Sequence, residues 1–173
     1  MEFIFTLKYQ LSEQDADQHN IVGRLLAAGC DDAVIGIGLP GRLALEFTTE
    51  ADSAVLAIRQ AISVVKNVIP SALLIEAAPD LVGLTDVAEL VGVSRQNMRK
   101  LMLAYPGNFP SPVHEGKTSL WHLTDILSWL KQRGSYQIPQ WLTEVAVVTM
   151  HVNISKEANR LADKGLPTLS QQG

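Results

Sequence analysis

The first part of the chain alternates apolar and polar residues in a pattern that predicts strands separated by helices. Residues 3–11 alternate throughout, which is typical of a half-buried strand. The apolar positions of this segment are Phe3, Phe5, Leu7, Tyr9 and Leu11. Shorter apolar segments predict three further strands at 33–37, 42–48 and 72–77.

Two segments between these strands have the spacing of amphipathic helices. Residues 15–28 predict one helix, which ends at Gly29. A second helix is predicted to begin within residues 49–52 and to run to about Asn67. Its apolar face is expected to carry Val55, Ile58, Ile62 and Val65.

The resulting order, β-α-β-β-α-β, predicts an α+β domain at residues 1–79 with a ferredoxin-like arrangement. We expect a four-stranded antiparallel sheet with both helices on one face. Right-handed crossovers place the first and third strands in the centre of this sheet. Pro79 and Asp80 mark the boundary to the next domain, through a short linker.

Residues 84–102 change to the pattern of two short helices joined by a tight turn. We expect Thr85 to cap the first helix. Gly92 suits the left-handed backbone at which such a helix stops, and Ser94 is a typical cap for the second helix. The buried side of the first helix is expected to be Val87, Ala88, Leu90 and Val91. These spacings predict a helix-turn-helix.

The second helix carries the first group of candidate DNA-binding residues. Met98, Leu101 and Met102 form its apolar side. Its other positions contain no acid and are Arg95, Gln96, Asn97, Arg99 and Lys100. Together with Ser94 at its start, they predict a recognition helix at 94–102 that enters the major groove, beside a wing near 115–119. Arginine can bond guanine, and Asn or Gln can pair with adenine, in the major groove, whereas Arg99 and Lys100 can also contact phosphates. A helical hairpin with this spacing also occurs in domains that bind no nucleic acid, and this alternative stays open.

The following segment predicts a winged arrangement. Residues 104–112 are rich in Pro and Gly and predict a loop, and residues 113–123 predict two short strands around a turn at 115–117. Lys117 and Thr118 at this turn can contact phosphates or the minor groove; the alternative is that they simply lie in an exposed turn.

A third helix is predicted at 126–132, capped by Thr124 and Asp125 and ended by Gly134. Trp121 and Trp129 lie among apolar neighbours, so we expect them in the core of residues 80–136 rather than as stacking platforms for bases.

Three segments of this region match a known pattern: LTDVAELVGVSRQNMRKLM, FPSPVHEGKTSLWH and LTDILSWL. They resemble the winged helix-turn-helix of excisionase-like and mercury-regulator-like DNA-binding proteins, over about 50 of 173 residues. The resemblance implies sequence-specific binding of double-stranded DNA, often in phage, mobile-element or repressor settings. Two departures are the longer loop between Met102 and Phe109 and the domain that precedes the helix-turn-helix, so the family's coupling mechanism is not carried over.

Residues 137–165 predict a long C-terminal helix, from Gln140 to about Lys164. Its apolar stripe is spaced 4, 3 and 4 residues apart, which is typical of a short coiled-coil seam. The stripe consists of Trp141, Val145, Val148 and Val152. We favour a partner subunit, and hence a homodimer, over packing on the same chain. The tail at 166–173 is expected to be flexible.

Charge is distributed unevenly along the 173 residues, which carry a net charge of -4. The first 79 residues contain 5 basic and 10 acidic side chains, and the remainder contains 9 and 8. The basic character is therefore local to the candidate DNA-binding element. Cys30 is the only cysteine, and residues 1–10 do not resemble a signal peptide. With no long apolar run either, these features favour a cytoplasmic protein without a membrane span.

No combination of residues predicts an enzyme, a metal site or a cofactor. The histidines, none of which has zinc-motif spacing, are His19, His114, His122 and His151. The carboxylates of Asp31 and Asp32 are expected to raise the pKa of the Cys30 thiol, which disfavours a reactive thiolate.

The sequence therefore predicts a dimeric DNA-binding transcriptional regulator. The N-terminal domain would bind a small effector, dock a protein partner or dimerise. The main alternative is an adaptor or antitoxin-like protein, whose N-terminal domain docks a partner while the helix-turn-helix tethers it to DNA.

Overall fold

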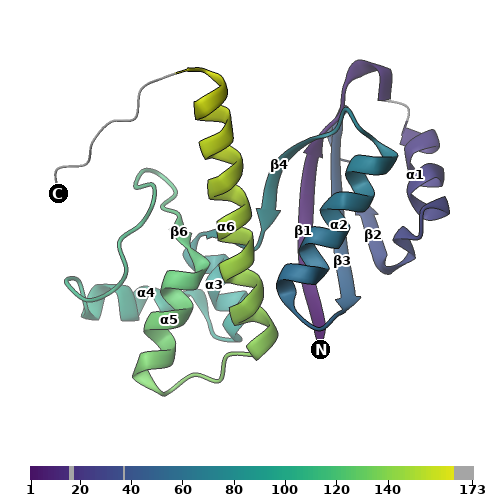
Figure 1. Ribbon diagram of the computed structural model, residues 1–173. Helices are drawn as coiled ribbons and strands as arrows, with labels where there is room; N and C mark the ends of the chain where they lie inside the picture. The colour runs from purple at the N-terminus through teal and green to yellow at the C-terminus, as the bar shows by residue number, and fades with distance from the viewer. Residues whose placement is uncertain (16–17, 37, 166–173) are drawn as a thin grey trace.

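A computed structural model describes residues 1–15, 18–36 and 38–165, so the predicted tail at 166–173 lies outside the described residues (Figure 1). The chain is a mixed α+β protein. Its first part contains β1 (Glu2–Gln10), α1 (Gln18–Ala27), β2 (Ala33–Gly36), β3 (Arg42–Glu50), α2 (Ala54–Val68) and β4 (Leu73–Ala78). Its second part contains β5 (Leu81–Val82), α3 (Leu84–Val91), α4 (Arg95–Ala104), β6 (Trp121–His122), α5 (Leu123–Arg133) and α6 (Gln140–Asp163).

The four strands of the first part form an antiparallel sheet in the order β2-β3-β1-β4, so the prediction of central first and third strands is confirmed. The alternation along β1 places Phe3, Phe5, Leu7 and Tyr9 on the buried face. Phe5 pairs with Phe47 of β3, and the two rings stack with centroids 5.2 Å apart.

Helices α1 and α2 cover this buried face (Figure 1), and Ile21, Leu25, Ile58 and Val65 reach the same core. The predicted start of the second helix at 49–52 is wrong. Thr49 and Glu50 continue β3, and α2 begins at Ala54, where the Ser53 hydroxyl accepts a hydrogen bond from the Leu56 N–H at 3.2 Å.

The face of α2 also differs from the prediction. Val55 is 43% exposed, and the side chains that approach the sheet beside Ile58 and Val65 are Ala54, Ala57 and Ala61. Small side chains let the helix lie close to the large Phe and Leu side chains of β1 and β3, so the alternation of small and large residues fills this core.

The second part has its own core, formed where α3, α4 and α5 meet. Fully buried side chains here include Val87, Met98, Ile126 and Leu130. Trp121 and Trp129 are 4% and 7% exposed, which confirms their predicted place in the core.

Helix α6 lies between the two parts of the molecule (Figure 1). Its predicted stripe packs on the first core through Trp141, Val145, Val148 and Val152, while Leu142 and Ala146 on the adjacent face belong to the second core. The prediction that a partner subunit covers this stripe is therefore wrong, because the chain's own first domain covers it.

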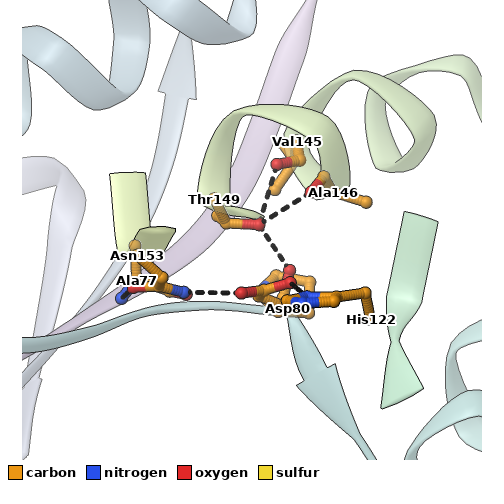
Figure 2. A network of polar contacts seen from close by, with 8 residues as sticks. Ala77, Asp80, His122, Val145, Ala146, Thr149 and Asn153 are labelled. Carbon is orange, nitrogen blue, oxygen red and sulfur yellow. Dashed lines mark hydrogen bonds and ion pairs between the residues drawn. The ribbon is translucent and has the colours of Figure 1, made fainter. Parts of the chain in front are cut away.

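The segment that joins the two parts is held by a buried polar network (Figure 2). The Asp80 carboxylate is fully buried, with the Nδ1 atom of His122 2.7 Å from Oδ1 and the Asn153 amide donating to Oδ2 at 2.8 Å. The Thr149 hydroxyl donates to the Pro79 carbonyl at 2.6 Å. The predicted linker at 79–80 is thus ordered, because side chains of α6 and His122 bond to it; we call this segment and its bonded side chains the joint.

Side chains of α6 also bond to the outer edge of β4. The Asn153 amide accepts from the Ala77 N–H and donates to the Ala77 carbonyl, both at 2.8 Å, as a neighbouring strand would. The Lys156 ammonium donates to the Ile75 carbonyl. At the opposite end of the sheet order lies β2, which pairs only with β3 among the described strands.

Candidate nucleic-acid interface

The turn between α3 and α4 is built by the residues that the sequence indicated. Gly92 ends α3 with φ of 77°, a left-handed conformation that other residues rarely adopt, and the Val93 N–H donates to the Ala88 carbonyl at 2.9 Å. The Ser94 hydroxyl accepts a hydrogen bond from the Asn97 N–H at 3.1 Å and so caps α4. The predicted roles of Gly92 and Ser94 are confirmed.

The start of α3 differs from the prediction that Thr85 caps it. Helix α3 begins at Leu84, so Thr85 lies within its first turn. The Asp86 carboxylate instead accepts a hydrogen bond from the Gly83 N–H at 2.9 Å. An acid in the first turn also interacts favourably with the helix dipole, so Asp86 stabilises this end of the helix.

The polar surface of α4 is available to a ligand. Met98 is buried, whereas Arg95, Gln96, Arg99 and Lys100 are exposed and Asn97 is half-buried. Arg95, Arg99 and Lys100 form no ion pair with any residue in the described part of the chain. Their charges are therefore not neutralised by neighbouring carboxylates.

A cleft of about 670 Å³ separates α4 from the 113–120 loop. Arg95 and Arg99, one helical turn apart, line it from α4, and Lys117 and Thr118 line it from the loop. Asp86 and Glu115 also line it, so its surface carries more basic than acidic side chains. The structure thus brings four of the predicted site residues around one cleft.

The other predicted residues of α4 lie on sides of the helix that do not face this cleft. At 100° per residue, Gln96 and Lys100 share the side next to Arg99, whereas Asn97 lies nearly opposite Arg95. Asn97 is thus turned away from the cleft and is half-buried. Ser94 is exposed at the start of the helix and is occupied as its cap.

Of the two short strands predicted within residues 113–123, the structure contains one, β6 at Trp121–His122, and the prediction that the two pair with each other is wrong. The 113–120 loop is closed by a single bridge, in which the Leu120 N–H donates to the His114 carbonyl at 2.9 Å and the Val113 N–H donates to the Leu120 carbonyl at 2.7 Å. The next residues, Trp121–His122, pair with Leu81–Val82 instead. Trp121 and His122 were predicted to pair with the other side of the 113–120 loop. Strand β5, which precedes α3, takes the place of that partner.

The long loop between α4 and residue 113 is held by the two tryptophans. The indole N–H of Trp121 donates to the Pro110 carbonyl at 2.9 Å, and that of Trp129 donates to the Asn108 side chain at 2.7 Å. The Phe109 ring packs against both indoles, with centroids 6.0 and 5.1 Å away. These contacts fix the distance between the two walls of the cleft.

Arg133 extends this support beyond the indoles. Its guanidinium lies 4.1 Å from the centroid of the Tyr105 ring and 4.8 Å from that of Trp129. Sequence reasoning placed the tryptophans in the core but missed their bonds to the loop and missed Arg133. The only indication was the Phe109-Pro110 pair within a loop that otherwise looked unconstrained.

Helix α5, which follows the 113–120 loop and β6, begins earlier than predicted. It starts at Leu123, whose N–H donates to the Asp80 carbonyl at 2.7 Å, so Thr124 and Asp125 lie in its first turn rather than capping it. Its end is as predicted, because Gly134 adopts φ of 73°.

Outside the cleft, two further features of residues 1–15, 18–36 and 38–165 bear on the sequence predictions, namely the Cys30 thiol and the arrangement of metal-binding side chains. Burial raises the pKa of the Cys30 thiol, and Asp32 and Asp31 raise it further, in the direction that the sequence predicted. No group of three or more His, Cys, Asp and Glu side chains in this part of the chain is placed to hold a metal ion. None of the described helices combines the length and apolar character needed to cross a membrane.

Comparison of the chain with protein-family models, with curated proteins and with solved structures finds no match. The assignment of function therefore depends on the geometry of the cleft and on the residues around it.

Proposed function

We propose that the chain is a sequence-specific DNA-binding protein that acts as a transcriptional regulator, with a winged helix-turn-helix at residues 80–136. One observation carries this proposal: Arg95 and Arg99 of α4, which are exposed and form no ion pair with the described residues, line a cleft whose opposite wall carries Lys117. A cleft with positive side chains on both walls matches the charge of a phosphate backbone.

The arrangement of the elements supports the same assignment. The α3–turn–α4 unit, the 113–120 loop as the wing and α5 follow one another in the order of a winged domain, as the sequence resemblance implies. The strand order β2-β3-β1-β4, with α1 and α2 on one face, supports a ferredoxin-like assignment for residues 1–79.

The proposed complex places α4 in the major groove, which is about 12 Å wide and admits one helix. Gln96, Lys100 and, at the start of the helix, Arg95 then face base edges, and Arg99 lies on the cleft side towards the phosphates. Lys117 and Thr118 contact the backbone or the minor groove from the wing. Asn97 contributes least, because it is half-buried.

The proposal is tested by selecting bound sequences from a random duplex pool with full-length protein at physiological salt. We expect an enriched motif, in two half-sites about 10 base pairs apart, or a multiple of that, if two copies bind together. Arg95→Ala should weaken binding to the selected site by about 1–3 kcal/mol, because it removes a bidentate contact with a base. Lys131→Ala, an exposed change on α5 away from the cleft, is the matched control.

Two results would contradict the proposal. One is a pool without enrichment, in which weak binding disappears as salt is raised. The other is equal affinity of the Arg95→Ala protein and the parent for the selected site.

A second candidate function is a partner-docking adaptor that the helix-turn-helix tethers to DNA. It is favoured by exposed apolar side chains of the first domain, since Val34 of β2, Leu39 and Leu73 are 71%, 70% and 66% exposed. It predicts a stable complex with a second protein on co-purification. Val34→Glu should disrupt that complex and leave DNA binding unchanged, and the absence of any co-purifying protein would count against it.

A further inference from the structure

A groove of about 520 Å³ runs between α2 and α6 over strand β4. The two helices lie side by side on the same side of the sheet (Figure 1). This volume falls within the roughly 300–1,000 Å³ that small-molecule sites typically occupy. The groove is separate from the cleft beside α4, and it has residues of both α2 and α6 on its walls.

The middle of the groove is apolar. Ile62 of α2, Leu74 of β4 and Val152 of α6 are half-buried there and belong to the edge of the first core. Each of these side chains still exposes apolar surface, which a ligand with an apolar portion would remove from water.

The rim of the groove is basic, although the first 79 residues contain twice as many acidic as basic side chains. Arg59 extends from α2, and Lys156 and Arg160 extend from α6. Asp163 is the acid among the lining residues. Ser155 and Asn159 add a hydroxyl and an amide on the same wall.

These cations differ in how far they are already neutralised. Lys156 is 3.1 Å and Arg160 3.7 Å from the carboxylate of Glu157, which is itself exposed. Arg59 forms no ion pair with a residue of the described ranges. Its guanidinium can therefore bind an anion without first losing a partner.

We propose that this groove binds a small amphipathic anion, namely a carboxylate or phosphate group attached to an apolar tail. Arg59 and Arg160 contact the anionic group, because the planar guanidinium bonds both oxygens of a carboxylate or phosphate at once. The tail lies over Ile62, Leu74 and Val152. The charge of the rim selects against amines of the same shape.

The position of the groove on α6 would let a bound ligand affect the second part of the molecule. One face of α6 lines the groove from His151 to Asp163, and Thr149 and Asn153 on the same helix bond to Pro79 and Asp80. A ligand that favours one position of α6 therefore shifts the conformational equilibrium of residues 79–80, which precede α3 and contact His122 at the start of α5. This regulatory consequence, unlike the binding itself, rests on the proposed DNA-binding function.

The binding is tested first without DNA, using octanoate, octyl phosphate and octylamine as matched probes. Thermal melting and titration calorimetry are run on the full chain. We expect octanoate or octyl phosphate to raise the melting temperature in a saturable way, because a ligand of the folded state stabilises it, and octylamine to give no shift.

Variants then test the groove itself. Arg59→Gln should weaken binding of the anionic probe about tenfold or more, as expected for the loss of a charge-assisted contact. Arg160→Gln should weaken it as well, as a second variant at the rim. Lys66→Gln, an exposed change on α2 outside the groove, is the control and should bind the probe as the parent does.

Three results would overturn the inference: no saturable binding of either anionic probe, equal binding of octylamine, or unchanged affinity of Arg59→Gln and Arg160→Gln. If a second copy of the chain covered the groove, sedimentation would show a dimer and neither anion would bind. Because these measurements contain no DNA, their failure is distinguishable from failure of the sequence selection. Octanoate added to the selected DNA complex then tests the regulatory consequence alone.

Discussion

At the scale of single residues, Asn153 forms the most consequential polar contacts in the joint. Its one amide group bonds both backbone groups of Ala77 and the buried carboxylate of Asp80, 73 residues away in sequence. The sequence could not predict this pairing, because an Asn on a helix carries no indication of a partner so far along the chain. Asp80 likewise looked like an ordinary linker residue, yet it is 1% exposed.

Replacement of Asn153 by Ala should lower the free energy of unfolding by roughly 2–4 kcal/mol, because it leaves the Asp80 carboxylate buried with one partner fewer. Urea denaturation measures this change. Asn159→Ala, an exposed position on the same helix, should change stability by less than about 0.5 kcal/mol. Equal stability of the two variants would show that the network does not hold the joint.

At the scale of elements, the sequence predicted helix ends better than helix starts. Gly92 and Gly134 were recognised because a positive φ at the end of a helix strongly favours glycine. Thr85 and Thr124 were mistaken for caps because Ser, Thr and Asp are also common in a first turn. The sequence predicted both walls of the cleft, α4 and the 113–120 loop. Their spacing depends on Trp121 and Trp129, whose hydrogen bonds to the loop after α4 could not be seen in the sequence.

The α3–α4 turn provides a test of how far backbone conformation sets the cleft. Gly92→Ala should destabilise the fold by about 1–2 kcal/mol, the cost of a left-handed conformation for an L-residue, and should weaken DNA binding. Thermal melting and a mobility-shift titration measure the two effects. Gly107→Ala is the control, because Gly107 has no positive φ and an added Cβ would meet no atom within 4 Å. A Gly92→Ala protein as stable as this control would contradict the role assigned to the turn.

At the scale of the whole molecule, α6 joins two hydrophobic cores into one structure. The stripe of Trp141, Val145, Val148 and Val152 was found in the sequence, but apolar spacing alone cannot distinguish a partner subunit from the chain's own sheet. The neighbouring face with Leu142 and Ala146, which contacts the second core, was not recognised as a separate apolar surface.

Because one helix contributes to both cores, the two parts should unfold in a single cooperative transition. In a Trp141→Phe background, which removes the tryptophan that contacts both cores, fluorescence of Trp121 and Trp129 reports the second core, and hydrogen exchange of the β1 amides reports the first. Both should give the same midpoint in urea. Val145→Ala should lower both midpoints together, because Val145 is fully buried in the first core on a helix shared with the second. Separate midpoints would show that α6 does not couple the two parts.

The contacts of Asn153 and Lys156 with β4 also limit how copies of this protein can aggregate. They occupy backbone groups on one border of the sheet that would otherwise be free to bind a strand from another molecule. The border formed by β2 has no such cover among the described residues. We therefore expect association through strands to occur at β2 and to end at a closed pair related by a twofold axis. Fibre growth, which needs two open borders on every copy, should be disfavoured while α6 stays docked on β4.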